Sequence, residues 1–178
     1  MVKVIRNFVS TELAYFCKLC LEHDCVMQDK VGNYASYEHG DKKWEYNYEF
    51  FSPQWGEMLL QKKLNHTKQI FKRNLYPVNS YARKYLKGEN LPEHVDRHHL
   101  EMSASIHLGG SAWDIYFDNK PYLLTPGDAI IYHGSVPHYR KELEGDTCYQ
   151  VFLHYSTNIK YKHHGRDYYK MYGKKSDE

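Results

Sequence analysis

The chain has 178 residues, a length that suits one domain with a sizeable core. Its 24 basic and 22 acidic residues nearly cancel, so charge gives no argument for a nucleic-acid substrate or an anionic membrane surface. No segment approaches the roughly 20 apolar residues of a transmembrane helix, and the first residues lack the apolar core of a cleavable signal. We therefore expect a soluble protein of the cytoplasm.

Residues 1–77 are predicted to be mostly helical and to support the rest of the chain. Residues 10–12, Ser-Thr-Glu, offer an N-cap and an acidic first turn for a helix that runs to about His23. Residues 31–40 contain two glycines and an asparagine and predict a loop. A second helix is expected to begin at Ser52-Pro53, with proline at its first position, and Pro77 is expected to end the helical region.

The cysteines near the N-terminus allow two interpretations. Cys17-x-x-Cys20 with His23 and Cys25 could form a zinc site, but no second pair of ligands follows. The alternative is a helical stripe of small core residues, and reduced thiols would suit the cytosol. This predicted stripe comprises Leu13, Phe16, Cys17, Cys20 and Leu21.

Residues 78–157 follow the pattern of short β-strands. Apolar and polar residues alternate, and turns recur, as at Pro126-Gly127-Asp128 before the buried run 129–132. Residues 138–143 and 148–155 are predicted to form a hairpin. About seven or eight short strands indicate a jelly-roll, so the fold class is mainly β with N-terminal helices. Residues 158–178 are expected to form a partly mobile tail.

His94, Asp96 and His138 are the candidate metal ligands. Alternate residues of a strand point to one face, so His94 and Asp96 could converge on one ion, while His138 must come from another strand. Two imidazoles and one carboxylate leave the opposite face of the ion open, as in the facial triad of non-haem Fe(II) oxygenases. The His-x-Asp triplet alone is weak, because roughly 0.7 such triplets are expected by chance in this composition. A surface histidine and aspartate on a polar loop is the alternative.

Three motifs occur in order along the chain and strengthen the metal site. They are Tyr85-x-x-Gly88 before His94-x-Asp96, Leu124-x-Pro126-Gly127-Asp128-Ala129, and Val136-Pro137-His138. Together they resemble the 2-oxoglutarate/Fe(II)-dependent dioxygenase superfamily, in the branch of the prolyl 4-hydroxylase catalytic domains.

This resemblance covers residues 81–155. It implies a double-stranded β-helix that binds Fe(II) through His94, Asp96 and His138, with 2-oxoglutarate and oxygen as co-substrates. It also implies hydroxylation of a C–H bond with release of succinate and CO₂, and we expect ascorbate to serve as a reductant.

One position departs from the pattern of this family. The pattern places Arg or Lys about ten residues after the distal histidine, where this chain has Cys148, with Gln150 beyond. We expect Arg140 to bind the far carboxylate of 2-oxoglutarate instead. Arg140 follows His138 by two residues, so it lies on the same face of the strand, roughly 6.5 Å further along it. Its planar guanidinium group can bind a carboxylate through two hydrogen bonds.

Other interpretations of these residues stay open. Arg140 could be a surface residue paired with Glu142 or Glu144, and Arg83 is then the reserve candidate for the carboxylate. Tyr85 is predicted to hydrogen-bond the co-substrate, although an alternating strand tyrosine could equally belong to the core.

The rival functions are a cupin-like metal dioxygenase that needs no 2-oxoglutarate, and a non-catalytic jelly-roll that binds a metal or ligand. The prime substrate is left open between a protein side chain, a free amino acid and a small metabolite. Nucleic acid is disfavoured by the charge balance.

Overall fold

The computed structural model describes residues 1–31, 36–39, 42–45 and 48–164. Its helices are α1 (Thr11–Val31), α2 (Gln54–Phe71) and the 3-10 helix η1 (Ile159–Tyr161). Its strands are β1 (Val2–Ile5), β2 (Ser36–His39), β3 (Lys42–Glu45), β4 (Tyr48–Phe51), β5 (Tyr76–Leu86), β6 (Leu91–His94), β7 (Met102–Gly110), β8 (Ile115–Phe117), β9 (Lys120–Tyr122), β10 (Ala129–His133), β11 (His138–Arg140) and β12 (Thr147–Ser156). No described helix is long and apolar enough to cross a membrane.

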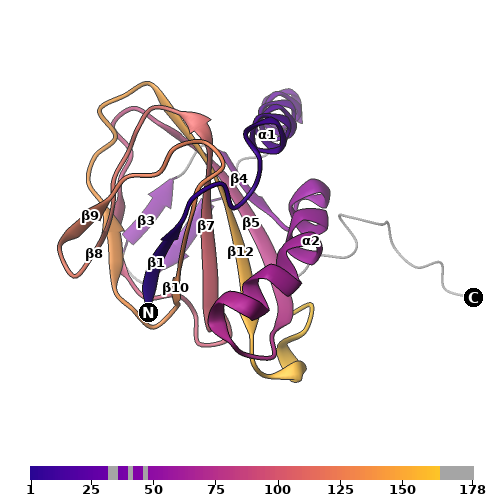
Figure 1. Ribbon diagram of the computed structural model, residues 1–178. Helices are drawn as coiled ribbons and strands as arrows, with labels where there is room; N and C mark the ends of the chain where they lie inside the picture. The colour runs from indigo at the N-terminus through magenta and orange to yellow at the C-terminus, as the bar shows by residue number, and fades with distance from the viewer. Residues whose placement is uncertain (32–35, 40–41, 46–47, 165–178) are drawn as a thin grey trace, which may run out of the picture.

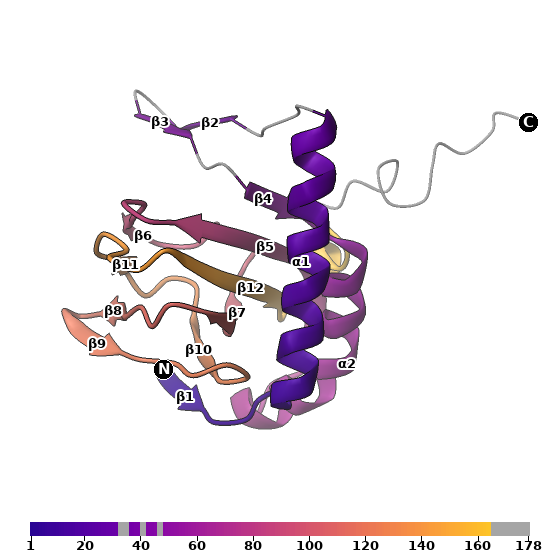
Figure 2. The same cartoon turned by 90° about the horizontal axis from the view of Figure 1, so that it is seen from above.

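Two antiparallel sheets face each other and form a double-stranded β-helix, as the fold class predicts. The larger sheet has the order β1-β10-β7-β12-β5-β4, and the smaller has β6-β11-β8-β9. Helices α1 and α2 cover the outer face of the larger sheet, and the smaller sheet lies on its other side (Figures 1 and 2). The larger sheet is therefore covered on both faces, which explains why nearly every residue of β12 is buried.

Strand β12 shows how the two sides of the larger sheet differ. Val151, Leu153 and Tyr155 belong to the apolar core that also contains buried residues of both helices. The alternate residues Gln150, Phe152 and His154 point the other way, between the two sheets. The space between the sheets therefore contains polar and ionisable groups, and it is the part of the fold where a site can form.

The predicted helices are present, with corrections at their ends. The Ser10 side chain accepts a hydrogen bond from the Leu13 amide at 3.2 Å and caps α1 as expected. The helix then continues to Val31, beyond the predicted end at His23. Helix α2 ends where Lys72 adopts a left-handed conformation, so the assignment of its end to Pro77, which lies within β5, is wrong.

The loop predicted for residues 31–40 is only partly described. Strand β2 occupies residues 36–39, which corrects that prediction, while residues 32–35 and 40 lie outside the described residues. The predicted tail begins with the short helix η1, and residues 165–178 lie outside the described part. The division into a helical support and a jelly-roll core stays a prediction, although β1 to β4 also fall in the first 77 residues.

The predicted cysteine stripe is only partly buried. Cys17 and Leu21 are buried, Leu13 and Cys20 are half-buried, and Phe16 is 58% exposed, while Ala14 and Cys25, which were not predicted, are buried. All four cysteines are free thiols. Among the described residues, the one group with metal-ligand geometry is elsewhere, so the zinc interpretation has no support there.

The predicted hairpin between residues 138–143 and 148–155 is wrong. Strand β11 pairs with β6 and β8 in the smaller sheet, whereas β12 pairs with β5 and β7 in the larger one. The connection between them therefore crosses from one sheet to the other. Alternation within each segment shows which residues share a face, but it does not show which strand is the partner.

Candidate metal centre

The three predicted ligands come together at one end of the space between the sheets. His94 on β6 lies directly opposite His138 on β11, and the ring centroids are 4.3 Å apart. Asp96 joins them, and one ligand atom from each residue lies within 4.8 Å of the others. One part of the expected geometry is wrong, because β6 ends at His94 and Asp96 lies in the following loop rather than on the same strand.

The loop after β6 is fixed by close backbone packing. The Asp96 amide donates a hydrogen bond to the Gly134 carbonyl at 2.8 Å. A Cβ atom at Gly134 would lie 2.1 Å from the Leu100 carbonyl oxygen and 2.9 Å from the Asp96 Cβ. Only glycine allows this approach, which brings the Asp96 carboxylate back toward the histidines.

Hydrogen bonds to backbone carbonyls orient both imidazole rings. The His94 Nδ1 lies 2.8 Å from the Pro92 oxygen, and the His138 Nδ1 lies 3.0 Å from the Val136 oxygen. A carbonyl can only accept, so each Nδ1 carries the proton and each Nε2 keeps its lone pair. This is the arrangement by which metal-binding histidines are usually held.

The Asp96 carboxylate is held by a chain of buried side chains. The Ser103 hydroxyl donates to the Asp96 Oδ2 at 2.6 Å, and the His154 Nδ1 lies 3.1 Å from the same hydroxyl oxygen. The Asp96 Oδ1 lies 3.8 Å from the His138 Nε2. One oxygen is thus engaged with the protein and the other faces the histidines.

The buried histidines are neutral at pH 7. Burial, followed by the nearby His94, lowers the pKa of His138 to about 3. Burial also lowers the pKa of His154 to about 4. A neutral imidazole is the form that binds a metal ion. Two imidazoles and one carboxylate are a donor set that fits Fe(II), so the residues match the ion that the sequence implies.

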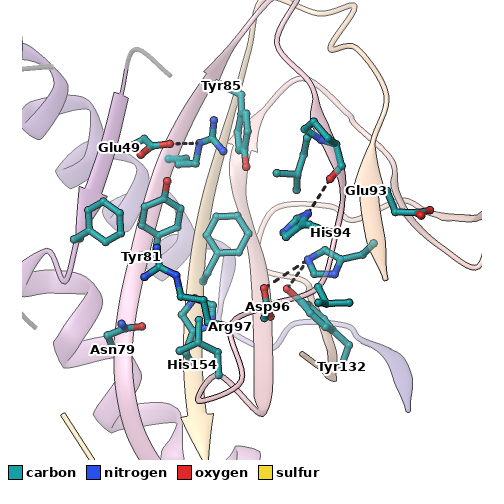
Figure 3. A pocket seen from close by; sticks show the side chains of 18 residues that line it. Glu49, Asn79, Tyr81, Tyr85, Glu93, His94, Asp96, Arg97, Tyr132 and His154 are labelled. Carbon is teal, nitrogen blue, oxygen red and sulfur yellow. Dashed lines mark hydrogen bonds and ion pairs between the residues drawn. The ribbon is translucent and has the colours of Figure 1, made fainter. Parts of the chain in front are cut away.

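A cavity of about 450 Å³ opens beside the three ligands (Figure 3). Its size lies in the range of small-molecule sites. Besides His94, Asp96 and His138, its wall contains charged and polar side chains together with aromatic rings: Glu49, Asn79, Tyr81, Arg83, Tyr85, Glu93, Arg97, Tyr132, Phe152 and His154.

Solved structures share this arrangement of sheets and helices, although no family model and no curated protein matches the sequence. A 2OG-Fe(II) oxygenase family oxidoreductase from Burkholderia pseudomallei aligns with a TM-score of 0.55 and 13% identity, over 76% of this chain and 80% of that one. The viral collagen prolyl hydroxylase vCPH from Paramecium Bursaria Chlorella virus-1, in its 2OG complex, aligns with a TM-score of 0.63 and 10% identity, over 88% and 96%. HygX from Streptomyces hygroscopicus, with nickel and 2-oxoglutarate bound, aligns with a TM-score of 0.61 and 8% identity, over 89% and 83%.

The fold is that of the 2-oxoglutarate oxygenases. The neighbours include prolyl hydroxylases, as the sequence resemblance predicts. At these low identities the likeness concerns the fold, and the roles of individual residues have to be argued from the site itself.

The two candidate arginines have different surroundings. Arg83 lines the cavity, and its guanidinium carbon lies 4.1 Å from the centre of the Tyr85 ring. Arg140 is absent from the described cavity wall and is 2% exposed. It packs against Trp113, whose ring in turn meets Tyr85 edge-on at 4.8 Å. The alternative of Arg140 as a surface residue is therefore wrong.

Arg140 has hydrogen-bond donors that the described protein groups do not use. Its Nη1 donates to the Trp113 carbonyl at 2.6 Å, while its Nε and Nη2 have no hydrogen-bond partner among the described residues. Buried donors are almost always satisfied. A carboxylate that takes both would remove this deficit, so Arg140 fits the far end of 2-oxoglutarate. Its role stays a prediction.

Several residues of the site were not predicted from the sequence. Ser103, Tyr132 and His154 surround the ligands, and Glu49 comes from β4, a strand that the sequence pattern did not indicate. The two-residue period of a strand could have indicated that Ser103 lies on the same face of β7 as His107. No sequence signal indicated that Glu49 lies opposite Arg83 in the sheet.

Proposed function

We propose that this protein is a 2-oxoglutarate- and Fe(II)-dependent oxygenase that hydroxylates a C–H bond and acts in the cytoplasm. The proposal rests on one observation. His94, Asp96 and His138 lie close together beside a cavity, in a fold shared with solved 2-oxoglutarate oxygenases. The neighbours' names support the reaction class by analogy.

The three ligands would hold Fe(II) on one face and leave the other open. Iron bound there supplies the activation of oxygen that couples the conversion of 2-oxoglutarate into succinate and CO₂ to hydroxylation of the prime substrate. The protein's part is to keep the His138 imidazole neutral, hold the Asp96 carboxylate through Ser103, and orient 2-oxoglutarate. Arg140 would bind its far carboxylate, and Tyr85 lies next to this position.

Two rivals predict different products. A cupin-like metal dioxygenase would use the metal but form no succinate from 2-oxoglutarate. A non-catalytic jelly-roll would bind the metal or a ligand without turnover. The buried Arg140 with unused donors favours the first proposal, because neither rival requires a buried cation beside the metal ligands.

The test is co-substrate turnover. Purified protein with Fe(II), 2-oxoglutarate and ascorbate should consume oxygen and release succinate slowly without a prime substrate. Ascorbate serves in this assay only to keep iron reduced, since no described contact supports a site for it. The absence of succinate while iron is demonstrably bound would reject the oxygenase in favour of its rivals.

The ligands are tested in parallel. His94→Ala, Asp96→Ala and His138→Ala should each lose bound iron and succinate formation, with the circular dichroism spectrum retained. His98→Ala is the matched control, because His98 follows Asp96 by two residues and lies outside the ligand group. Iron content equal to that of the unmodified protein in any of the three would show that the residue is not a ligand.

A further inference from the structure

The cavity wall contains a buried pair of opposite charges away from the metal ligands. Glu49 on β4 and Arg83 on β5 lie opposite each other in the larger sheet and both line the cavity. Each side chain is 3% exposed, and the Glu49 Oε1 lies 3.6 Å from the Arg83 Nε.

This pair is poorly explained as a stabilising contact. Both charges give up most of their hydration, and a buried ion pair is often no more stabilising than apolar residues of the same volume. The 3.6 Å separation is also longer than the roughly 2.7–2.9 Å of a good charge-assisted hydrogen bond. Both residues line the cavity, so a ligand in it can contact either charge.

Aromatic rings frame the two charges. The Tyr81 hydroxyl hydrogen-bonds to Glu49, and the Tyr81 ring packs against Phe51 at 4.8 Å and Phe152 at 5.6 Å. Figure 3 shows Glu49 and Tyr81 on the side of the cavity opposite His94 and Asp96. A molecule held by the pair would thus present its other end to the metal ligands across an apolar surface.

We propose that Glu49 binds the ammonium group and Arg83 the carboxylate of a free α-amino acid, the prime substrate of the oxygenase proposed above, on which this inference rests. An α-amino acid carries both charges on one carbon atom, so it can meet both members of the pair at once. Its side chain then extends across the cavity, where the reactive carbon faces His94 and Asp96.

The same pair argues against two other occupants. 2-Oxoglutarate has two carboxylates, and Glu49 would repel either one, whereas Arg140 offers buried donors and forms no ion pair with an acid among the described residues. A residue within a peptide chain carries neither terminal charge, so it would offer no opposite charge to either member of the pair. This disfavours a peptide at this position.

Calorimetric titration of the metal-free protein with each of the 20 free L-amino acids tests the proposal. Each amino acid is compared with its N-acetyl amide, which keeps the side chain and removes both charges. At least one free amino acid should bind at least tenfold more tightly than its amide. Because this measurement needs no metal or turnover, it can succeed or fail independently of the oxygenase assay. If no amino acid shows this preference, the proposal is wrong.

The pair itself is tested by Glu49→Gln/Arg83→Gln, which removes both charges together and avoids leaving one buried charge alone. This variant should lose at least tenfold in affinity for the amino acid while its circular dichroism spectrum is retained. Lys18→Gln/Glu22→Gln is the matched control, because that pair, at 3.2 Å, lies outside the cavity on α1. Unchanged affinity in the cavity variant, or a loss of 2-oxoglutarate affinity in Arg83→Gln, would overturn the proposal.

Discussion

Asp96 depends on its neighbours more than the two histidines do. It lies in a loop, and the hydrogen bond from Ser103 at 2.6 Å holds one of its oxygens. Ser103 is itself held by the His154 Nδ1 at 3.1 Å, and both residues are buried. Residues of this kind, which contact a metal ligand and not the metal, often decide the affinity of a site.

Ser103→Ala should therefore weaken metal binding by roughly 10–100-fold with little change in fold. The alanine leaves the Asp96 Oδ2 without its donor, so the carboxylate no longer has one fixed orientation. Competition titration with Co(II) measures the affinity directly. Ser105→Ala is the matched control, because the Ser105 hydroxyl contacts Gln150 at 3.4 Å and no ligand. Equal Co(II) affinity in the two variants would show that Ser103 has no part in holding Asp96.

Arg140 should determine the affinity for 2-oxoglutarate. Arg140→Gln removes a charge-assisted contact worth about 1.5–3 kcal/mol, so the dissociation constant should rise by roughly one to two orders of magnitude. Arg140→Lys should recover only part of the affinity, because an ammonium group cannot reproduce the planar fork. Anaerobic titration of the iron–oxoglutarate absorption band gives the constant.

Arg97→Gln is the matched control for Arg140, since Arg97 is an exposed arginine of the cavity wall. An unchanged constant in Arg140→Gln, together with a large rise in Arg83→Gln, would assign the carboxylate to Arg83. That outcome would also remove Arg83 from the amino-acid site.

At the level of the elements, the sequence predicts on which face of a strand a residue lies, but it does not predict which strands pair with each other. The strand period places His138 and Arg140 on one face, and the structure buries both. The same period wrongly suggests that residues 138–143 form a hairpin with 148–155, because a two-residue period does not identify the neighbouring strand. Sequence order suggested adjacency here, but the chain changes sheets between β11 and β12.

The candidate site likewise contains residues that the sequence predicts and a residue that it misses. The resemblance predicted His94, Asp96 and His138, and the structure brings them within 4.8 Å of one another. The sequence did not predict Glu49, because β4 is a four-residue edge strand whose pairing with β5 spans more than 30 residues of chain. Such a contact leaves no periodic signal in either segment.

Across the whole molecule, Asp128 ties the N-terminal segment to the jelly-roll. Strand β1 extends the larger sheet at β10, and Asp128 lies just before β10. Its carboxylate accepts hydrogen bonds from the Thr125 amide at 2.9 Å and the Thr125 hydroxyl at 2.7 Å. It also accepts from the Asn7 amide at 3.0 Å and from Arg6 at 2.5 Å. One ionised group thus joins the turn before β10 to the chain between β1 and α1.

The Asp128 carboxylate should give the fold part of its acid sensitivity. Hydrogen bonds from Thr125, Arg6 and Asn7 outweigh burial and lower its pKa from 3.8 to about 2. A lowered pKa means that the folded state favours the ionised form, by about 2 kcal/mol for this shift. That contribution is complete above the unfolded pKa of about 4, and it is lost as the pH falls toward 2. Asp128→Asn should therefore reduce the free energy of unfolding by about 2 kcal/mol at pH 6 and by much less at pH 2.

Urea unfolding of both proteins between pH 6 and pH 2 measures this difference. Asp146→Asn is the matched control, because Asp146 is an exposed aspartate in the loop between β11 and β12. It should follow the unmodified protein across the range. A constant gap between Asp128→Asn and the unmodified protein from pH 6 to pH 2 would mean that the loss arises from packing or neutral hydrogen bonds. In that case the ionised carboxylate would not be what joins the N-terminal segment to the turn before β10.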